Sequence, residues 1–86
     1  MSDHKLIGWE IINGALHKSF VFKDFSEAFS FMTRVAFEAE KLDHHPDWNN
    51  SYNKVTISLT THSKGEVTDL DYQLAARIED IFNHNL

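Results

Sequence analysis

Two adjacent histidines, His44 and His45, are the residues of this chain best suited to proton transfer, because imidazole exchanges a proton near neutral pH. They belong to the segment 40–48, EKLDHHPDW, which also contains the only proline and one of the two tryptophans. Proline disfavours the helical conformation for the residue before it, so Pro46 predicts an extended His45 and a helix that ends near Asp43. A fixed corner of this kind often carries functional side chains. The same residue types also suit exposed turns, so a plain solvated connection is the alternative interpretation.

The composition excludes several classes of protein and predicts one domain over residues 1–86. Hydrophobic residues make up 42% of the chain and include seven phenylalanines, which predicts a largely aromatic core. The net charge of -5, without a run of lysine or arginine, argues against direct binding of nucleic acid. The absence of cysteine excludes disulfides, thiolate metal sites and cysteine nucleophiles. No stretch resembles a signal peptide or a membrane span of about 20 residues, so a cytoplasmic location is expected.

The beginning of the chain predicts a β-hairpin. Apolar and other side chains alternate over residues 7–11, as they do in a strand. The pair Asn13-Gly14 favours a type I′ turn, because both central residues of that turn need positive φ. Alternation then resumes over residues 16–22, which predicts the second strand of the hairpin.

A long amphipathic helix is expected next, over residues 25–41. Asp24 is a good N-cap, and Glu27 three residues later completes a capping-box pattern. Apolar residues then recur at helical spacing, which is typical of a helix packed on a core. Phe29 and Phe37 lie off the main apolar stripe, and contact with a second subunit is one explanation for them.

A further strand and a second helix complete the pattern. Residues 55–61 alternate between apolar and polar side chains, which predicts a strand with one buried face. The alternation places His62 on the polar face or at the end of that strand. A short extra strand over residues 48–51 is left open. Thr68 is the expected N-cap of the second helix, which is predicted to end near Asn83.

The order strand, strand, helix, strand, helix predicts an α+β two-layer sandwich. An antiparallel sheet of three to four strands would carry two long helices on one face, and its other face would be polar. The corner after the first helix and the end of the last strand both join the sheet to the helices, and whether their side chains converge on one cleft is left open. The candidate titratable residues are His44, His45, His62, Glu40, Asp43, Asp47 and Asp71.

Five motifs in this chain occur together in one known family. They are FMTRVA at 31–36, AEKLDHHPDW at 39–48, YNKV at 52–55, LTTH at 59–62 and DLDYQLA at 69–75. In these motifs the chain closely resembles the pterin-4a-carbinolamine dehydratase family, over nearly its whole length. The resemblance implies an enzyme, 4a-hydroxytetrahydrobiopterin dehydratase, a carbon–oxygen hydro-lyase that works without a cofactor or metal. Its product is the quinonoid dihydropterin of tetrahydrobiopterin recycling.

The resemblance also implies the site and the partners. The three active-site histidines of the family correspond to His44, His45 and His62. Family members form homodimers or homotetramers around a small-molecule pterin site. Animal members also bind a homeodomain transcription factor, so a partner protein and a nuclear location are expected if the source is an animal. Animal members carry an additional N-terminal helical segment, whereas this sequence starts almost at the first expected strand, so the oligomer type and that partner stay open.

The chemistry of dehydration fits these residue types. Loss of water from the carbinolamine needs a proton on the leaving hydroxyl, while the N5 lone pair forms the new double bond and N5 loses its proton. Our hypothesis is that His45, held by Pro46, is the principal acid/base group. His44 would hold the substrate and assist, and His62 would act from the opposite side. Opposed histidines would serve both stereoisomers of the 4a-hydroxyl.

Five neighbours are weaker candidates for contact with the substrate. Pro46 shapes the corner, and Trp48 either stacks on the flat pterin or packs in the core. Asp43 and Glu40 either orient a histidine through its second nitrogen or are simply solvated. Asp71 is more typical of an acid that caps the second helix.

Two rival functions stay open. Three imidazoles can form an open zinc site, but adjacent side chains diverge on an extended backbone and no familiar metal-ligand spacing is present. The second rival is a non-catalytic scaffold, a dimerisation cofactor that stabilises a partner protein through the exposed apolar side of the 25–41 helix.

Overall fold

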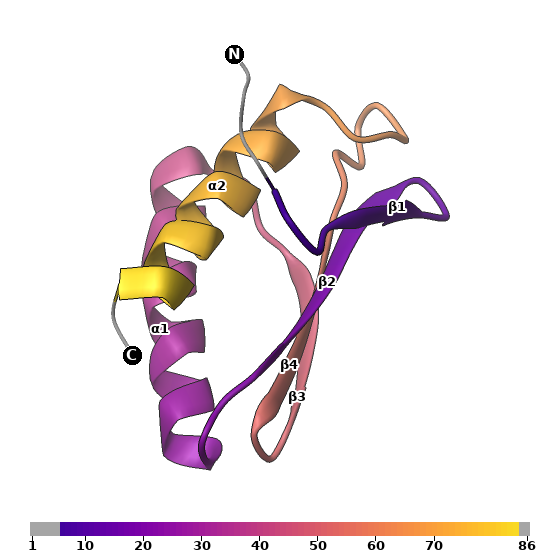
Figure 1. Cartoon of the computed structure of the whole chain (residues 1–86). Coiled ribbons are helices and arrows are strands. Elements are labelled where there is room, and N and C mark those ends of the chain that lie inside the picture. The colour runs from indigo at the N-terminus through magenta and orange to yellow at the C-terminus, as the bar shows by residue number, and fades with distance from the viewer. Residues whose placement is uncertain (1–5, 85–86) are drawn as a thin grey trace.

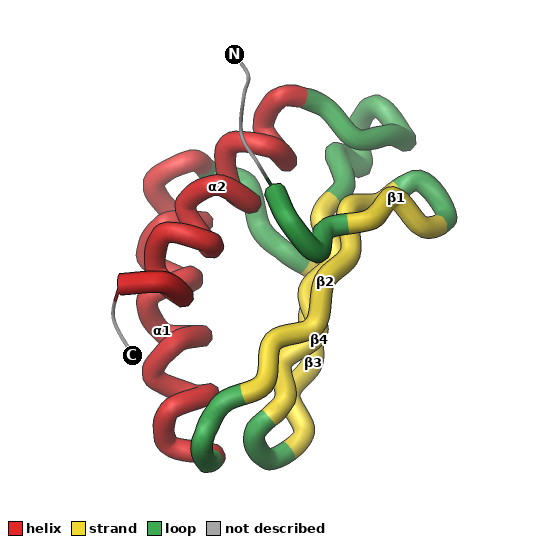
Figure 2. Tube along the Cα trace, in the orientation of Figure 1, coloured by secondary structure: helices red, strands yellow, loops and turns green. Residues whose placement is uncertain are grey.

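The computed structural model describes residues 6–84, which form two layers (Figure 1). The elements in chain order are β1 (Glu10–Ile12), β2 (Ala15–Val21), α1 (Phe25–Leu42), β3 (Asp47–Ser51), β4 (Lys54–Leu59) and α2 (Asp69–His84). The sheet is antiparallel, with the strand order β1-β2-β4-β3. Both helices lie on one side of the sheet, and no helix of the described residues covers the other side (Figure 2). The predicted α+β sandwich is confirmed, and the extra strand that the sequence left open is β3.

The turn between β1 and β2 confirms the predicted hairpin. Asn13 and Gly14 have φ values of 50° and 78°, the positive values that a type I′ turn needs. The first strand is shorter than predicted, however. It was expected from residue 7 and begins only at Glu10, because the chain from Leu6 to Trp9 forms a turn. The N–H of Trp9 donates to the carbonyl of Leu6 at 3.3 Å, which bends the backbone out of the sheet.

Helix α1 begins and ends close to the predicted residues. The N–H of Glu27 donates to Oδ1 of Asp24 at 2.9 Å, so the predicted N-cap is confirmed. At the other end Asp43 adopts a left-handed conformation with φ 52°. Its backbone N–H donates to the carbonyls of Ala39 and Glu40, which satisfies two acceptors that the end of a helix leaves open. Both ends of the helix are therefore fixed by local hydrogen bonds.

The core lies between the helices and the covered face of the sheet. Its fully buried side chains come from β2, β4, α1 and α2; they include Phe20, Ala28, Phe31, Val35, Val55, Ile57, Leu59, Leu74, Ala75 and Ile78. Four phenylalanines pack around its centre, with ring centroids 4.8 to 6.1 Å apart: Phe20, Phe22, Phe31 and Phe82. The predicted aromatic core is confirmed. Neither α1 nor α2 carries an apolar stretch of the length that crossing a bilayer requires.

A clamp of three side chains fastens α2 to the sheet. Oε2 of Glu79 accepts hydrogen bonds from Nζ of Lys18 at 2.5 Å and from Nε1 of Trp9 at 2.8 Å. Lys18 also lies 4.8 Å from the ring centroid of Phe20, where a cation–π contact is favourable. The covered face of the sheet thus contributes Lys18 of β2 to an ion pair, and this pair fixes the middle of α2.

Strand β4 ends earlier than the sequence predicts. It stops at Leu59, and Thr61 makes only an isolated bridge with Glu66. The N–H groups of Lys64 and Gly65 both donate to the carbonyl of Thr61, at 2.9 Å each, and this closes a turn over residues 62–65. Of the two positions predicted for His62, the polar face or the end of the strand, the structure shows the second, because His62 lies in the turn that follows β4.

Candidate active site

At the corner between α1 and β3, the side chains of His44 and His45 point in different directions. The N–H of His44 donates to the carbonyl of Ala39 at 3.0 Å, so the backbone leaves the helix tightly. Residues 44–46 are neither helix nor strand, and β3 begins directly after them. The side chain of His44 reaches α2, whereas that of His45 turns back to α1. Adjacent histidines on this corner thus face different surroundings.

His44 is held by a buried carboxylate. Its Nε2 lies 2.5 Å from Oδ1 of Asp71, and the two side chains are 11% and 0% exposed. The other oxygen of Asp71 accepts hydrogen bonds from Oγ1 of Thr61 and from the backbone N–H of Thr68, both at 2.8 Å. Oγ1 of Thr68 lies 2.7 Å from Oγ1 of Thr61. Asp71 therefore caps α2, as predicted, and at the same time binds a histidine 27 residues earlier in the chain.

The other two histidines are paired with exposed carboxylates. Nε2 of His45 lies 2.6 Å from Oε2 of Glu40, with side chains 55% and 74% exposed. Nε2 of His62 lies 3.4 Å from Oδ2 of Asp47, with side chains 74% and 66% exposed. Pairs this open to water contribute roughly 0–1 kcal/mol and hold their side chains loosely. The three imidazoles thus share one pattern, an Nε2 atom against a carboxylate, but differ widely in burial.

A continuous set of contacts brings the three predicted histidines into one region. Asp71 links His44 to Thr61, which immediately precedes His62 in the chain. His62 in turn contacts Asp47, which lies two residues after His45. The end of α1, the start of β3, the turn after β4 and the start of α2 therefore meet here. The convergence that the sequence left open is present in the structure.

The remaining candidates occupy different positions. Trp48 is half-buried, packs against the core and pairs with Ile57 of β4, which agrees with the core-packing alternative. Pro46 is half-buried between the corner and β3. Asp43 is exposed, and no hydrogen bond or ion pair of its carboxylate is found in the part of the chain that the structure describes. Of the two acids expected to orient a histidine, the structure therefore pairs only Glu40 with one.

Thr61 is the site residue that sequence reasoning missed. It was counted as part of a strand, yet its hydroxyl is buried and donates to Asp71. Thr68 was identified only as an N-cap. The spacing of Thr68 and Asp71 is that of a capping box, and it could have indicated that the carboxylate points inward. No local signal indicates the contact with His44, because that contact depends on the packing of α2 against the corner.

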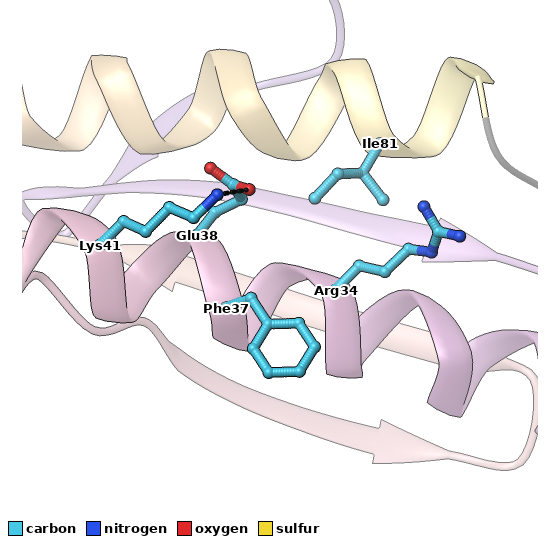
Figure 3. A pocket seen from close by; sticks show the side chains of 5 residues that line it. All are labelled: Arg34, Phe37, Glu38, Lys41 and Ile81. Atoms are coloured by element: carbon cyan, nitrogen blue, oxygen red, sulfur yellow. Dashed lines mark hydrogen bonds and ion pairs between the residues drawn. The ribbon is translucent and has the colours of Figure 1, made fainter.

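A separate groove lies on the outer side of the helix layer. It has a volume of about 610 Å³ and is lined by Arg34, Phe37, Glu38, Lys41 and Ile81 (Figure 3). Partial burial raises the pKa of Glu38, but hydrogen bonds from Arg77 and Lys41 and their charges outweigh this effect and hold the pKa below its usual 4.5. None of the predicted site residues lines this groove. Residues 6–84 also contain no cluster of three or more histidine and acidic side chains arranged to hold a metal ion.

Comparison with known proteins identifies the relatives of this chain. The family model described as "Pterin 4 alpha carbinolamine dehydratase" matches residues 2–81. A relative from Prochlorococcus marinus (strain MIT 9515), provisionally named as a pterin-4-alpha-carbinolamine dehydratase, is 53% identical over 78 residues, which cover 91% of this chain and 81% of the relative. A relative from Synechococcus sp. (strain WH7803), with the same provisional name, is 56% identical over 71 residues, which cover 83% and 76%.

Solved structures agree with the sequence relatives. The crystal structure described as a transcriptional coactivator/pterin dehydratase from Brucella melitensis has a TM-score of 0.85 and 49% identity, covering 87% of this chain and 82% of that one. A pterin dehydratase-like protein described as a RuBisCO assembly factor in the alpha-carboxysome has a TM-score of 0.70, covers 85% and 84%, and is 22% identical, which shows a shared fold alone. This chain therefore belongs to the pterin-4a-carbinolamine dehydratase family.

Proposed function

We propose that this protein dehydrates 4a-hydroxytetrahydrobiopterin to quinonoid dihydropterin and water, as a cytoplasmic enzyme of tetrahydrobiopterin recycling. In the reaction the C4a–O bond breaks, the hydroxyl leaves as water after it gains a proton, and N5 loses its proton as the C4a–N5 double bond forms. Two proton transfers are therefore needed and no oxidant or reductant. Imidazole suits both transfers, because each of its forms is accessible near neutral pH.

The observation that carries the proposal is the convergence of His44, His45 and His62 on one region. Each has its Nε2 atom against a carboxylate, which leaves the other ring nitrogen of each available for proton exchange. The family relationship supports the same reaction class. We propose the same roles as the sequence suggests: His45 is the principal acid/base group, His44 holds the substrate and assists in proton transfer, and His62 acts from the opposite side. The burial of His44 supports its holding role, since a fixed imidazole can orient a flat ring.

Stopped-flow absorbance of chemically generated 4a-hydroxytetrahydropterin tests the proposal. The wild-type protein should speed the decay of both stereoisomers. His44→Ala and His45→Ala should each lower kcat/KM by roughly 10²-fold, the usual contribution of one acid/base group. His84→Ala is the matched control, because within residues 6–84 this exposed histidine is bonded only to Asp80, at the far end of α2. If the wild type leaves the decay at the buffer rate, the protein is not a dehydratase and the scaffold alternative replaces this proposal.

A second role is favoured by the exposed aromatic side chains of α1. Phe25, Phe29 and Phe37 are 50%, 55% and 63% exposed, and the first two pack on each other with ring centroids 6.0 Å apart. Three exposed phenylalanines on one helix are unusual for a protein that stays monomeric. We propose that α1 mediates association into a homodimer or homotetramer. A partner protein bound to the same helix, as the scaffold alternative requires, is the other outcome of the association test.

A further inference from the structure

We propose that Asp71, fixed by Thr61 and Thr68, locks His44 in the tautomer that carries its proton on Nε2, so that Nδ1 is the atom His44 offers to the substrate. Asp71 is then a positioning residue that acts through His44 and does not touch the pterin. The inference deepens the proposed dehydratase function and rests on it only for the kinetic consequence. The tautomer itself is a property of the folded protein and can be measured without substrate.

The direction of every hydrogen bond in this network follows from proton counting. Thr61 has one hydroxyl proton, and it is donated to Oδ2 of Asp71. The contact between Thr61 and Thr68 must therefore use the hydroxyl proton of Thr68. The backbone N–H of Thr68 is a second donor to Oδ2. Two donors thus reach Oδ2 of Asp71 directly, and the third supports the hydroxyl of Thr61, an arrangement that favours an ionised carboxylate.

The remaining oxygen of Asp71 determines the tautomer of His44. A carboxylate only accepts hydrogen bonds, so Nε2 of His44, at 2.5 Å from Oδ1, must be the donor. A neutral imidazole with its proton on Nε2 has its lone pair on Nδ1. His44 is only 11% exposed, so water competes little for this contact. Burial is what separates this pair from the exposed pairs of His45 and His62, whose tautomers solvent can interchange.

The second ring nitrogen of His44, Nδ1, has no hydrogen-bond partner among the described residues, although His44 is largely buried. Nδ1 is also not enclosed, since the described, non-exposed residues contain no buried side-chain nitrogen or oxygen without a partner. Nδ1 therefore keeps some solvent-accessible surface at the corner, where His45 and His62 also lie. The lone pair can accept the proton that N5 of the pterin loses, and the resulting imidazolium is stabilised by Asp71.

Asp71→Asn is the sharpest test, because asparagine has nearly the same shape as aspartate and should reverse the predicted tautomer of His44. The two donors at Oδ2 should hold the amide oxygen there, which leaves the amide NH₂ group facing Nε2 of His44. Nε2 must then accept, and the proton moves to Nδ1. The amide oxygen keeps the cap of α2 through the N–H of Thr68. Thr61→Val and Thr61→Ser form a second pair, since only serine restores the hydroxyl donor.

Long-range ¹H–¹⁵N correlation spectra of the uniformly ¹⁵N-labelled full chain report the tautomer. His44→Gln assigns the His44 signals, and measurement at about pH 8 keeps free imidazoles neutral. We expect a protonated Nε2 at His44 in the wild type and a protonated Nδ1 in Asp71→Asn. Thr61→Val should give signals averaged between the tautomers, and Thr61→Ser should restore the wild-type pattern.

The kinetic consequence separates positioning from substrate binding. In Asp71→Asn kcat should fall by roughly 10²-fold while KM changes little, because the substrate loses a proton acceptor and no contact. A protonated Nδ1 in the wild type, or an unchanged tautomer in both Asp71→Asn and Thr61→Val, would overturn the inference. A rise in KM with constant kcat would place Asp71 in contact with the pterin instead. If the wild type has no dehydratase activity but shows the Nε2–H tautomer, the proposed function fails and the tautomer assignment stands.

Discussion

The clamp between α2 and the sheet gives a stability prediction whose size follows from the structure. Glu79 accepts one hydrogen bond from the Lys18 ammonium and one from the Trp9 indole. A hydrogen bond to a charged group contributes about 1.5–3 kcal/mol, so the two bonds together contribute about 3 kcal/mol at the lower end of that range. The Lys18 and Glu79 side chains keep 17% and 18% of their exposure, so water replaces part of what is lost. We expect Glu79→Ala to lower the free energy of unfolding by about 2 kcal/mol.

Two further variants divide this loss between its causes. Glu79→Gln keeps an acceptor for Trp9 and removes only the charge, so it should cost about half as much as Glu79→Ala. Lys18→Met removes the positive charge of the ion pair and keeps an apolar side chain that can pack near Phe20. The double variant with Lys18→Met and Glu79→Ala should be less destabilised than the sum of the two single variants, because no unpaired charge is left.

Urea and thermal denaturation followed by circular dichroism measure these effects. In a domain of this size 2 kcal/mol corresponds to a fall in Tm of about 10 °C. Dehydratase kinetics should be unchanged in Glu79→Ala at temperatures where it is folded, because Thr61 and Thr68 fix Asp71 independently at the other end of α2. A Tm within about 2 °C of the wild type, or strict additivity in the double variant, would refute the reasoning.

Three other predictions concern α1 and its ends. Because the pKa of Glu38 is lowered in the folded state, its ion pairs stabilise the fold above about pH 4.5, and this stabilisation is lost as the pH falls through the folded pKa. The difference in urea midpoint between wild type and Glu38→Gln should therefore shrink from about pH 7 to about pH 3. Asp43→Gly should raise the free energy of unfolding by about 0.5–1 kcal/mol, because φ is 52° there, and should leave kcat/KM unchanged unless the carboxylate serves the site. Light scattering should give a lower mass for Phe37→Glu than for the wild type and an unchanged mass for Tyr52→Glu, an exposed aromatic residue in the β3–β4 turn.

Most of the fold could be predicted from the sequence because its signals are local. The Asn13-Gly14 turn needs only the φ preferences of two residues, and the cap of α1 needs only the spacing of Asp24 and Glu27. The errors arose where two local signals compete. Alternation continued through Thr61, but the hydrogen bonds of the turn over 62–65 ended the strand earlier. Periodicity indicates which side chains can share a face and does not indicate where the backbone leaves the sheet.

The candidate site was only partly predictable, because its most constrained contact links distant parts of the chain. The sequence favoured His45 as the best-fixed histidine, since Pro46 follows it directly. Proline restricts the backbone of the preceding residue, however, and the imidazole of His45 remains 55% exposed. What fixes a side chain is a buried partner, and the partner of His44 lies on α2. Sequence reasoning identified Asp71 as a cap and had no basis for assigning its second oxygen.

The position of α2 therefore connects the stability of the fold to the chemistry of the site. Its first turn carries Asp71, which Thr61 joins to the end of the sheet, and its middle carries Glu79, which Lys18 joins to the same sheet. The sheet holds the helix at two separate points, so losing one of them should weaken the fold without rotating the first turn. The orientation of His44 depends on the first point alone. A residue that positions the site and a residue that only stabilises the fold can thus be told apart on one helix, because only the first should change both the tautomer of His44 and kcat.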